Sequence, residues 1–153
     1  MNKIKKQVCN LCIATVLLFC LTGCGSVHTY MTYTYSVNTG DSIDLKFDTT
    51  NGYQITSDIP FEISKDGEVL STGSFIISDG YQMYVDAVST DENATVIETG
   101  STDTCEYLMW NYNDSEYNYV IYIKNSNTGI LIGNTVSEES AKEVFGRLQI
   151  SLH

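Results

Sequence analysis

Residues able to act as a catalytic nucleophile with its base are scarce in this 153-residue sequence. Cys105 is one candidate nucleophile, but a thiol or hydroxyl needs a base such as histidine held close by. The two histidines are His28, near the N-terminus, and His153, at the C-terminal end. We therefore interpret Cys105 as a half-buried thiol on a strand. There is also no GxSxG motif, no His/Cys cluster with zinc spacing and no glycine-rich phosphate loop, so we expect neither catalytic activity nor a cofactor.

Carboxylates offer two other kinds of chemistry. Two of them about 5 to 9.5 Å apart in a cleft could hydrolyse a glycosidic bond, so a small hydrolase is kept as the less favoured alternative. Turns at 41–44, 48–51 and 111–116 carry several side-chain oxygens, the ligands that Ca²⁺ prefers. None has the spacing of an EF-hand loop, and Asx residues are common in turns for their own backbone hydrogen bonds. We interpret these segments as surface turns and predict no metal site.

Aromatic residues give a signal for binding. The chain has 11 tyrosines and one tryptophan, and two neighbouring predicted strands carry many of them. Exposed rings with polar tips stack on sugars or anchor partner surfaces, whereas the same rings could instead fill the edge of a core. The candidate binding face consists of Tyr107, Trp110, Tyr112, Tyr117, Tyr119 and Tyr122.

The N-terminal segment has the features of an export signal. Lys3, Lys5 and Lys6 precede residues 8–22, an apolar stretch of about 15 residues, which is the length of a signal-peptide core. A transmembrane helix needs about 20 apolar residues. The stretch ends in Leu21-Thr22-Gly23-Cys24, which resembles the lipobox of bacterial lipoproteins at all four positions. This resemblance implies cleavage before Cys24 and a diacylglyceryl group on its sulfur.

Three parts of the chain follow from this resemblance: a signal peptide (1–23), a lipidated tether (24–30) and one domain (31–153). Cys9 and Cys12 have CxxC spacing, but they lie inside the apolar signal stretch, where chance explains that spacing best. Cys20 also lies there, so Cys105 would be the only thiol left and no intrachain disulfide could form.

The net charge of the chain indicates which classes of partner the domain could bind. The formal net charge is −11, and losing the three lysines of residues 1–23 would make it −14. Nucleic acids and anionic lipid surfaces require clustered Lys and Arg, so the domain itself is expected to bind neither. The charge is compatible with a cationic partner or divalent cations, or with acids that only keep a tethered domain soluble.

Alternating apolar residues and turn dipeptides predict a mainly β domain. A hairpin is expected at 31–37 and 43–47, strands at 53–56, 61–63 and 69–77 with an Asp66-Gly67 turn, another at 94–98, and a meander at 105–112, 117–124 and 128–136. Residues 79–89 fit a helix by the spacing of Tyr81, Tyr84, Val85 and Val88, although a strand is the alternative. We favour the helix because Ser78 or Asp79 could cap it.

A second helix is expected at 137–148. Ser137 is a good N-cap, and Ala141, Val144, Phe145 and Leu148 form an apolar stripe that must face a sheet. Residues 148–152 are expected to end the chain in an extended stretch. Strands joined by tight turns, with two helices, predict the α+β class with a mainly antiparallel sheet.

The order of elements resembles the PsbP-type fold, in which hairpins, a helix, a meander and a C-terminal helix build an α/β/α sandwich. The segments that carry this resemblance are Asn51-Gly52-Tyr53, Pro60-Phe61 with Asp66-Gly67, Gly73-Ser74-Phe75, and Asn127-Thr128-Gly129 followed by Ser137-Glu138-Glu139-Ser140-Ala141. The resemblance implies no reaction, because such folds carry unrelated functions.

Together these observations predict a binding domain without catalytic activity, lipid-anchored at the extracytoplasmic face of the cell membrane. Its partner would be a protein or a cell-wall polymer. The alternative is carbohydrate or wall-polymer binding through the tyrosine-rich face.

Overall fold

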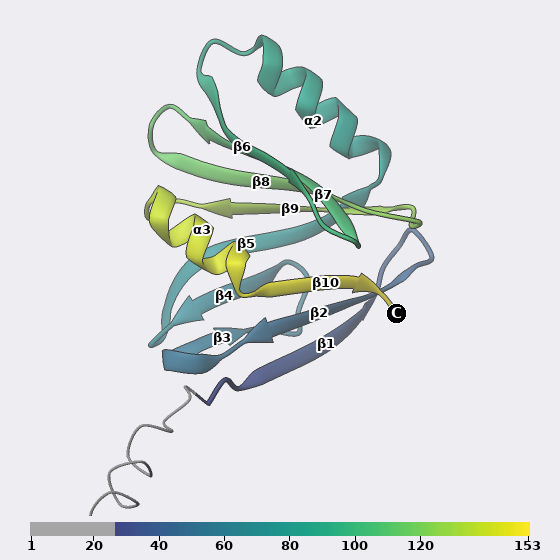
Figure 1. Ribbon diagram of the computed structural model, residues 1–153, viewed down its shortest axis with the longest axis vertical. Coiled ribbons are helices and arrows are strands. Elements are labelled where there is room, and N and C mark those ends of the chain that lie inside the picture. The colour runs from purple at the N-terminus through teal and green to yellow at the C-terminus, as the bar shows by residue number, and fades with distance from the viewer. Residues whose placement is uncertain (1–26) are drawn as a thin grey trace, which may run out of the picture.

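The computed structural model describes residues 27–153 (Figure 1). The predicted signal peptide and Cys24 lie outside the described residues. Within 27–153 the chain forms two α-helices and ten strands. The helices are α2 (Asp79–Thr90) and α3 (Glu138–Gly146). The strands are β1 (Tyr30–Ser36), β2 (Ser42–Asp48), β3 (Tyr53–Ile55), β4 (Phe61–Lys65), β5 (Glu68–Ile77), β6 (Ala94–Ser101), β7 (Cys105–Tyr112), β8 (Glu116–Ile123), β9 (Thr128–Asn134) and β10 (Leu148–Leu152), and a short 3-10 turn, η1 (Thr50–Gly52), precedes β3.

Seven strands form the central sheet, in the order β3-β4-β5-β9-β8-β7-β6. Every neighbouring pair in it is antiparallel. The β4–β5 hairpin turns at Asp66 and Gly67, whose φ angles of 52° and 89° are the left-handed values that a tight two-residue hairpin turn requires. The predicted meander is present as β7, β8 and β9. The α+β class with mainly antiparallel sheet is therefore confirmed.

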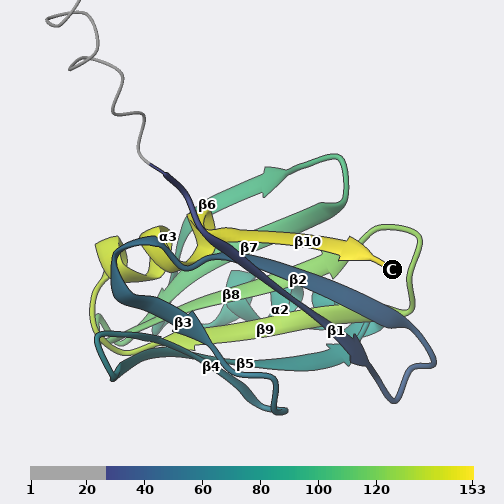
Figure 2. The same cartoon turned by 90° about the horizontal axis from the view of Figure 1, so that it is seen from below.

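A second sheet has three strands in the order β1-β2-β10. The predicted N-terminal hairpin supplies β1 and β2. The extended stretch expected near the C-terminus is β10, which pairs with β2 from Leu148 opposite Phe47 to Leu152 opposite Ile43. Figure 2 shows β10 beside β2, with the first and last strands of the described chain in the same sheet.

The central sheet separates two apolar clusters, because successive residues of a strand point to opposite faces. Met109 and Ile121 belong to the cluster covered by α3 and the three-stranded sheet. Leu108 and Val120 belong to the cluster covered by α2. The layer on the face opposite α2 thus consists of α3 and the three-stranded sheet beside it.

The ends of the helices differ in part from expectation. Helix α2 is present, but neither Ser78 nor another residue makes a side-chain capping bond at its start. At α3, the backbone N–H of Ser140 donates to Ser137 Oγ at 3.1 Å, which is the predicted cap. Helix α3 ends at Gly146 and not at Leu148, because the carbonyl of Arg147 already accepts a hydrogen bond from Asp48 N–H and brings the chain into β10.

The start of the described chain is attached to the body earlier than expected. Tyr30, assigned above to the tether, is the first residue of β1. Thr29 is bonded as well, since its carbonyl accepts from Thr49 N–H at 2.8 Å and its N–H donates to Thr50 Oγ1 at 3.0 Å. His28 Nδ1 lies 2.8 Å from Asp48 Oδ2.

Candidate functional site

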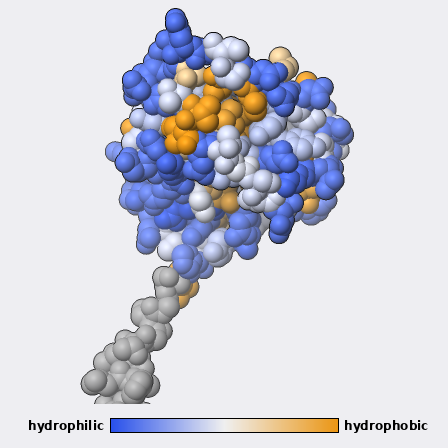
Figure 3. Space-filling model, turned by 45° about the horizontal axis from the view of Figure 1, so that its top comes forward, coloured by the Kyte–Doolittle hydropathy of each residue, from blue (hydrophilic) through white to orange (hydrophobic). Residues whose placement is uncertain are grey.

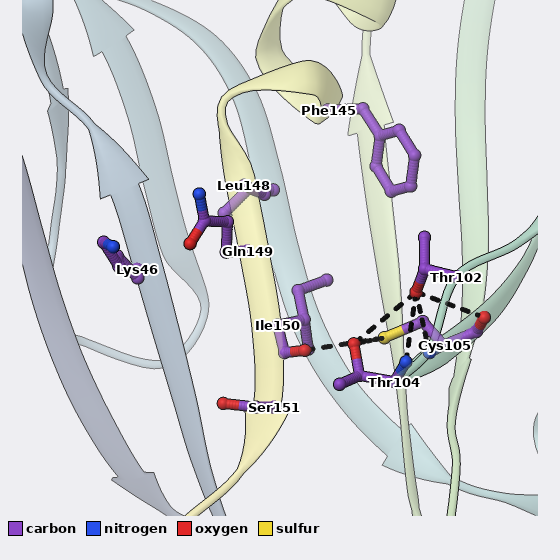
Figure 4. Close-up of a pocket in the computed structure, with 9 residues that line it drawn as sticks. All are labelled: Lys46, Thr102, Thr104, Cys105, Phe145, Leu148, Gln149, Ile150 and Ser151. Carbon is purple, nitrogen blue, oxygen red and sulfur yellow. Dashed lines mark hydrogen bonds between the residues drawn. The ribbon is translucent and has the colours of Figure 1, made fainter. Parts of the chain in front are cut away.

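One groove lies between β10 and the turn that joins β6 to β7 (Figure 4). Its volume is about 360 Å³. Phe145, Leu148 and Ile150 provide apolar surface, and the Cys105 thiol lies beside them. The polar residues around the groove are Lys46, Thr102, Thr104, Gln149 and Ser151.

The Cys105 thiol in this groove is not activated. Its sulfur is within 3.6 Å of Thr104 Oγ1 and 3.8 Å of the Ile150 carbonyl oxygen, which accepts from the S–H group. Burial raises the pKa of the Cys105 thiol above its ordinary value, which favours the neutral form. The ring nitrogens of His28 and His153 contact the carboxylates of Asp48 and Asp44 on β2. These contacts fit a structural thiol and not a cysteine nucleophile.

The six aromatic residues expected to form one binding face are divided between the two faces of the central sheet. Tyr107, Tyr117 and Tyr119 pack with the cluster under α3. Trp110 and Tyr112 pack with the cluster under α2. Tyr122 joins them on that face through Tyr81 of α2, with ring centroids 6.1 Å apart. The six rings therefore do not form a single exposed row.

The rings on the α3 side hold the helix in place. Tyr119 is 2% exposed and stacks on Phe145, with ring centroids 4.2 Å apart. The Tyr107 hydroxyl donates to Glu98 Oε1 at 2.6 Å, and this bond, with burial, raises the pKa of Tyr107. Burial likewise raises the pKa of Tyr119. These contacts are those of a packed interface between helix and sheet.

The rings on the α2 side line a second cavity, which we call the aromatic pocket. It has a volume of about 340 Å³ and lies between the C-terminal half of α2 and the sheet. Trp110 and Tyr112, two residues apart on β7, project from the same face of the sheet. Tyr84 of α2 covers Trp110, with ring centroids 5.7 Å apart. The residues that line the pocket are Tyr84, Ala87, Val88, Asp91, Ala94, Trp110, Tyr112, Glu116, Asn118 and Leu131.

The charges at the aromatic pocket are all negative. Asp91 follows the last turn of α2 and Glu116 begins β8, opposite Tyr112. Neither takes part in the ion pairs formed within residues 27–153. Between Val69 and Ile123 the sequence has nine acidic residues and no Lys, Arg or His. The pocket can therefore attract cations, and it disfavours anions.

The oxygen-rich turns are occupied by hydrogen bonds within the protein. Asp41 Oδ2 accepts from Asn127 N–H and from Thr128 Oγ1, each at 2.7 Å, which ties the β1–β2 turn to the β8–β9 turn. Asn111 Oδ1 accepts from Asp114 N–H at 2.8 Å. Residues 27–153 contain no group of three or more His, Cys, Asp or Glu side chains placed to hold a metal ion. The Asx residues act here as turn residues.

Comparison with known proteins found no match. The chain matches no protein-family model, no curated protein and no solved structure. Among the described residues, no helix combines the length and apolar character needed to cross a bilayer.

Sequence reasoning found Trp110 and Tyr112 but missed the other groups of the aromatic pocket. Tyr84 was assigned to the apolar stripe of a helix, which is where it lies. Glu116 lies in the segment 111–116 that the sequence predicts as a surface turn, and Asp91 follows the helix predicted at 79–89. The sequence did contain one signal for them, namely the long acidic stretch without a basic residue that includes both.

Proposed function

We propose that this protein is a lipid-anchored binding domain at the outer face of the cell membrane and that it has no catalytic activity. The observation that carries the proposal is the lipobox-like Leu21-Thr22-Gly23-Cys24 at the end of a cationic and then apolar segment. A diacylglyceryl group on Cys24 would supply two acyl chains, and stable membrane attachment takes two such signals.

The short tether limits where the domain can work. Tyr30, the first residue of β1, is six residues after Cys24, so an extended chain spans at most about 20 Å between them. β1 begins at the end of the molecule opposite α2 (Figure 1). With Cys24 in the membrane, α2 and the aromatic pocket would face away from the lipid, toward the cell wall. Anchoring would also raise the effective concentration of the domain near membrane partners.

A second candidate function is binding of a carbohydrate or another cell-wall polymer. The aromatic pocket supports it, because Tyr84, Trp110 and Tyr112 place three rings around one cavity. This cavity, and not all six predicted aromatic residues, would be the binding surface. A protein partner remains the other possibility. A small hydrolase is the least supported function, because the Cys105 thiol is buried with a raised pKa and the two carboxylates at the aromatic pocket, Asp91 and Glu116, are both exposed.

The finer description of the fold belongs to the same proposal. Helix α2 after the hairpins, the meander β7–β9 and the C-terminal α3 follow the order of a PsbP-type α/β/α sandwich. The three-stranded sheet beside α3 is the departure from that plan. An experimental structure superposed on PsbP-type proteins would test the likeness.

The anchor is tested by Cys24→Ser, with Cys20→Ser as the matched control inside the apolar stretch. Both variants are expressed in a bacterium, the membrane and soluble fractions are separated, and the products are weighed by mass spectrometry. We expect the Cys20→Ser protein to be acylated and membrane-bound, and the Cys24→Ser protein to lack the lipid. An acylated Cys24→Ser product would overturn the proposal.

Wall-polymer binding is tested by pull-down of the full-length protein with purified cell wall. Tyr112→Ala should weaken retention several-fold, because the ring lines the aromatic pocket. Tyr122→Ala is the control, since that ring lies on the same face of the sheet but outside the pocket. Equal retention of both variants and the unmodified protein would count against the pocket as the binding surface.

A further inference from the structure

We propose that the aromatic pocket binds an organic ammonium group, either a quaternary ammonium or a protonated amine. This inference rests on the proposed function and names the ligand class of the same site. The volume of about 340 Å³ lies in the range of small-ligand pockets. Three properties of the pocket favour a cation over a neutral sugar or an anion.

The first property is its aromatic walls. The faces of Trp and Tyr rings carry negative electrostatic potential, and ammonium groups bind over them within about 6 Å of the ring centre. Trp110 and Tyr112 form the floor from β7, and Tyr84 contributes from α2. Trp110 is only 6% exposed, so a broad sugar ring would find little of its face for stacking, whereas a compact cationic group needs less area.

The second property is carboxylates without basic partners. Asp91, after the end of α2, and Glu116, at the start of β8, both line the pocket, and both side chains are exposed. Asp91 Oδ1 accepts hydrogen bonds from the backbone N–H and the side-chain amide of Asn93, at 2.9 and 3.2 Å. These neutral donors leave its negative charge in place. No Lys or Arg lines the pocket.

The third property is the C-terminal end of α2. The last carbonyl groups of a helix carry partial negative charge, which cations stabilise. The last turn of α2 has no basic residue, and Ala87, Val88 and Asp91 from this end all line the pocket. The helix end and the two carboxylates therefore act in the same direction. An ammonium group would neutralise charge that no described side chain neutralises.

Trp110 adds a preference for an oxygen close to the ammonium group. Its indole N–H makes no hydrogen bond within residues 27–153, and its nitrogen is not among the buried polar atoms without a partner, so solvent or a ligand can reach it. An indole N–H can only donate, so it pairs with an acceptor. A hydroxyl or ester oxygen a few bonds from the ammonium nitrogen would supply one. Amino alcohols and their esters, such as choline, have this arrangement.

The chain contains a built-in reporter, because Trp110 is its only tryptophan. Full-length protein in a non-ionic detergent is titrated with choline while Trp110 fluorescence is recorded. The matched probe is 3,3-dimethyl-1-butanol, which has the shape and hydroxyl of choline without its charge, and sodium chloride controls for ionic strength. We expect a saturable change with choline and at least fivefold weaker binding of the neutral probe.

Variants separate the pocket from general acidity. Glu116→Gln and Asp91→Asn should each weaken choline binding about fivefold, because each removes one charge near the ammonium group. Tyr112→Ala should weaken binding further, while Tyr112→Phe retains it. Glu106→Gln is the control, since Glu106 is on the same face of the sheet but does not line the pocket. Circular dichroism of each variant verifies that it is folded.

The possible outcomes distinguish a failure of the ammonium assignment from a failure of the function on which it rests. Equal binding of choline and the neutral alcohol, or an equal loss in Glu106→Gln, would overturn the ammonium assignment. A Trp110 response to neutral wall oligosaccharides without one to choline would also overturn it, yet would support the wall-polymer function. Failure of the anchor is seen separately, in the Cys24→Ser fractionation.

Discussion

Replacing Gly73 with alanine is expected to destabilise the fold strongly. Gly73 on β5 lies opposite Phe61 on β4, and the ring of Phe61 covers the glycine. A methyl group added at Gly73 would overlap that ring. Phe61 is fully buried and packs against Tyr35 and Phe75, with ring centroids 6.0 and 5.9 Å away. The ring therefore has no free space into which it could move.

The size of the effect follows from this packing. Inserting a methyl group into a well-packed core costs about 1–3 kcal/mol, and we expect the upper end because the overlapping atoms belong to a rigid ring. A loss of about 3 kcal/mol lowers Tm by roughly 10 °C for a domain of this size. Gly146→Ala is the matched control. Its added methyl group has no atom within 4 Å, and alanine in a helix should stabilise by about 0.5 kcal/mol.

Urea unfolding of the full-length protein, followed by circular dichroism and Trp110 fluorescence, measures both effects. A second variant tests the mechanism, since Phe61→Leu in the Gly73→Ala background should recover part of the loss by removing the overlapping ring atoms. The reasoning would be refuted by a Gly73→Ala protein within about 0.5 kcal/mol of the unmodified one, because overpacking costs more than that.

Three further predictions concern single side chains. Hydrogen bonds from Thr50, followed by the contact with His28, lower the pKa of Asp48 from 3.8 to about 2, so its contribution to stability is present above about pH 4 and is lost as the pH falls toward 2. Asp48→Asn should therefore flatten the dependence of Tm on pH in that window, and an unchanged pH profile would contradict this. Ser137→Ala should cost about 1 kcal/mol in urea unfolding, because Ser140 N–H loses its acceptor at the start of α3; no loss would mean that water replaces the cap. Cys105 should react with a thiol reagent at pH 8 only as fast as the domain opens, because the thiol is buried and its pKa is raised. Fast labelling under native conditions would instead show that the groove exposes the thiol.

Local patterns in the sequence were sufficient to predict the helices, strands and turns, but not how the strands pair in the sheets. The Asp66-Gly67 hairpin, the Ser137 cap and the helix at α2 each depend on neighbours within a few residues, and all are present. The pairing of β5 with β9 depends on residues more than fifty positions apart, which no turn signal specifies. The same holds for β10, which was expected to be extended but not assigned to a sheet.

The aromatic residues show how much can be predicted from the alternation of side chains along a strand. In β7, Tyr107 and Trp110 are three residues apart and must point to opposite faces, so the sequence already implied that the six rings could not form one surface. Which face carries α2 could not be obtained this way. The position of Tyr84 over Trp110 depends on how the helix docks, and the pocket exists only because of that docking.

The pairing of β10 with β2 also affects the order of folding. A chain is synthesised from its N-terminus, so β1 and β2 are made long before Leu148 can meet Phe47. Until then the inner edge of β2 has no partner, and its apolar residues Ile43, Leu45 and Phe47 lack part of the cover that keeps them buried in the finished domain. Contacts between such distant parts of a chain slow folding. A nascent β1–β2 hairpin therefore keeps an open, apolar edge that favours aggregation until the last strand arrives.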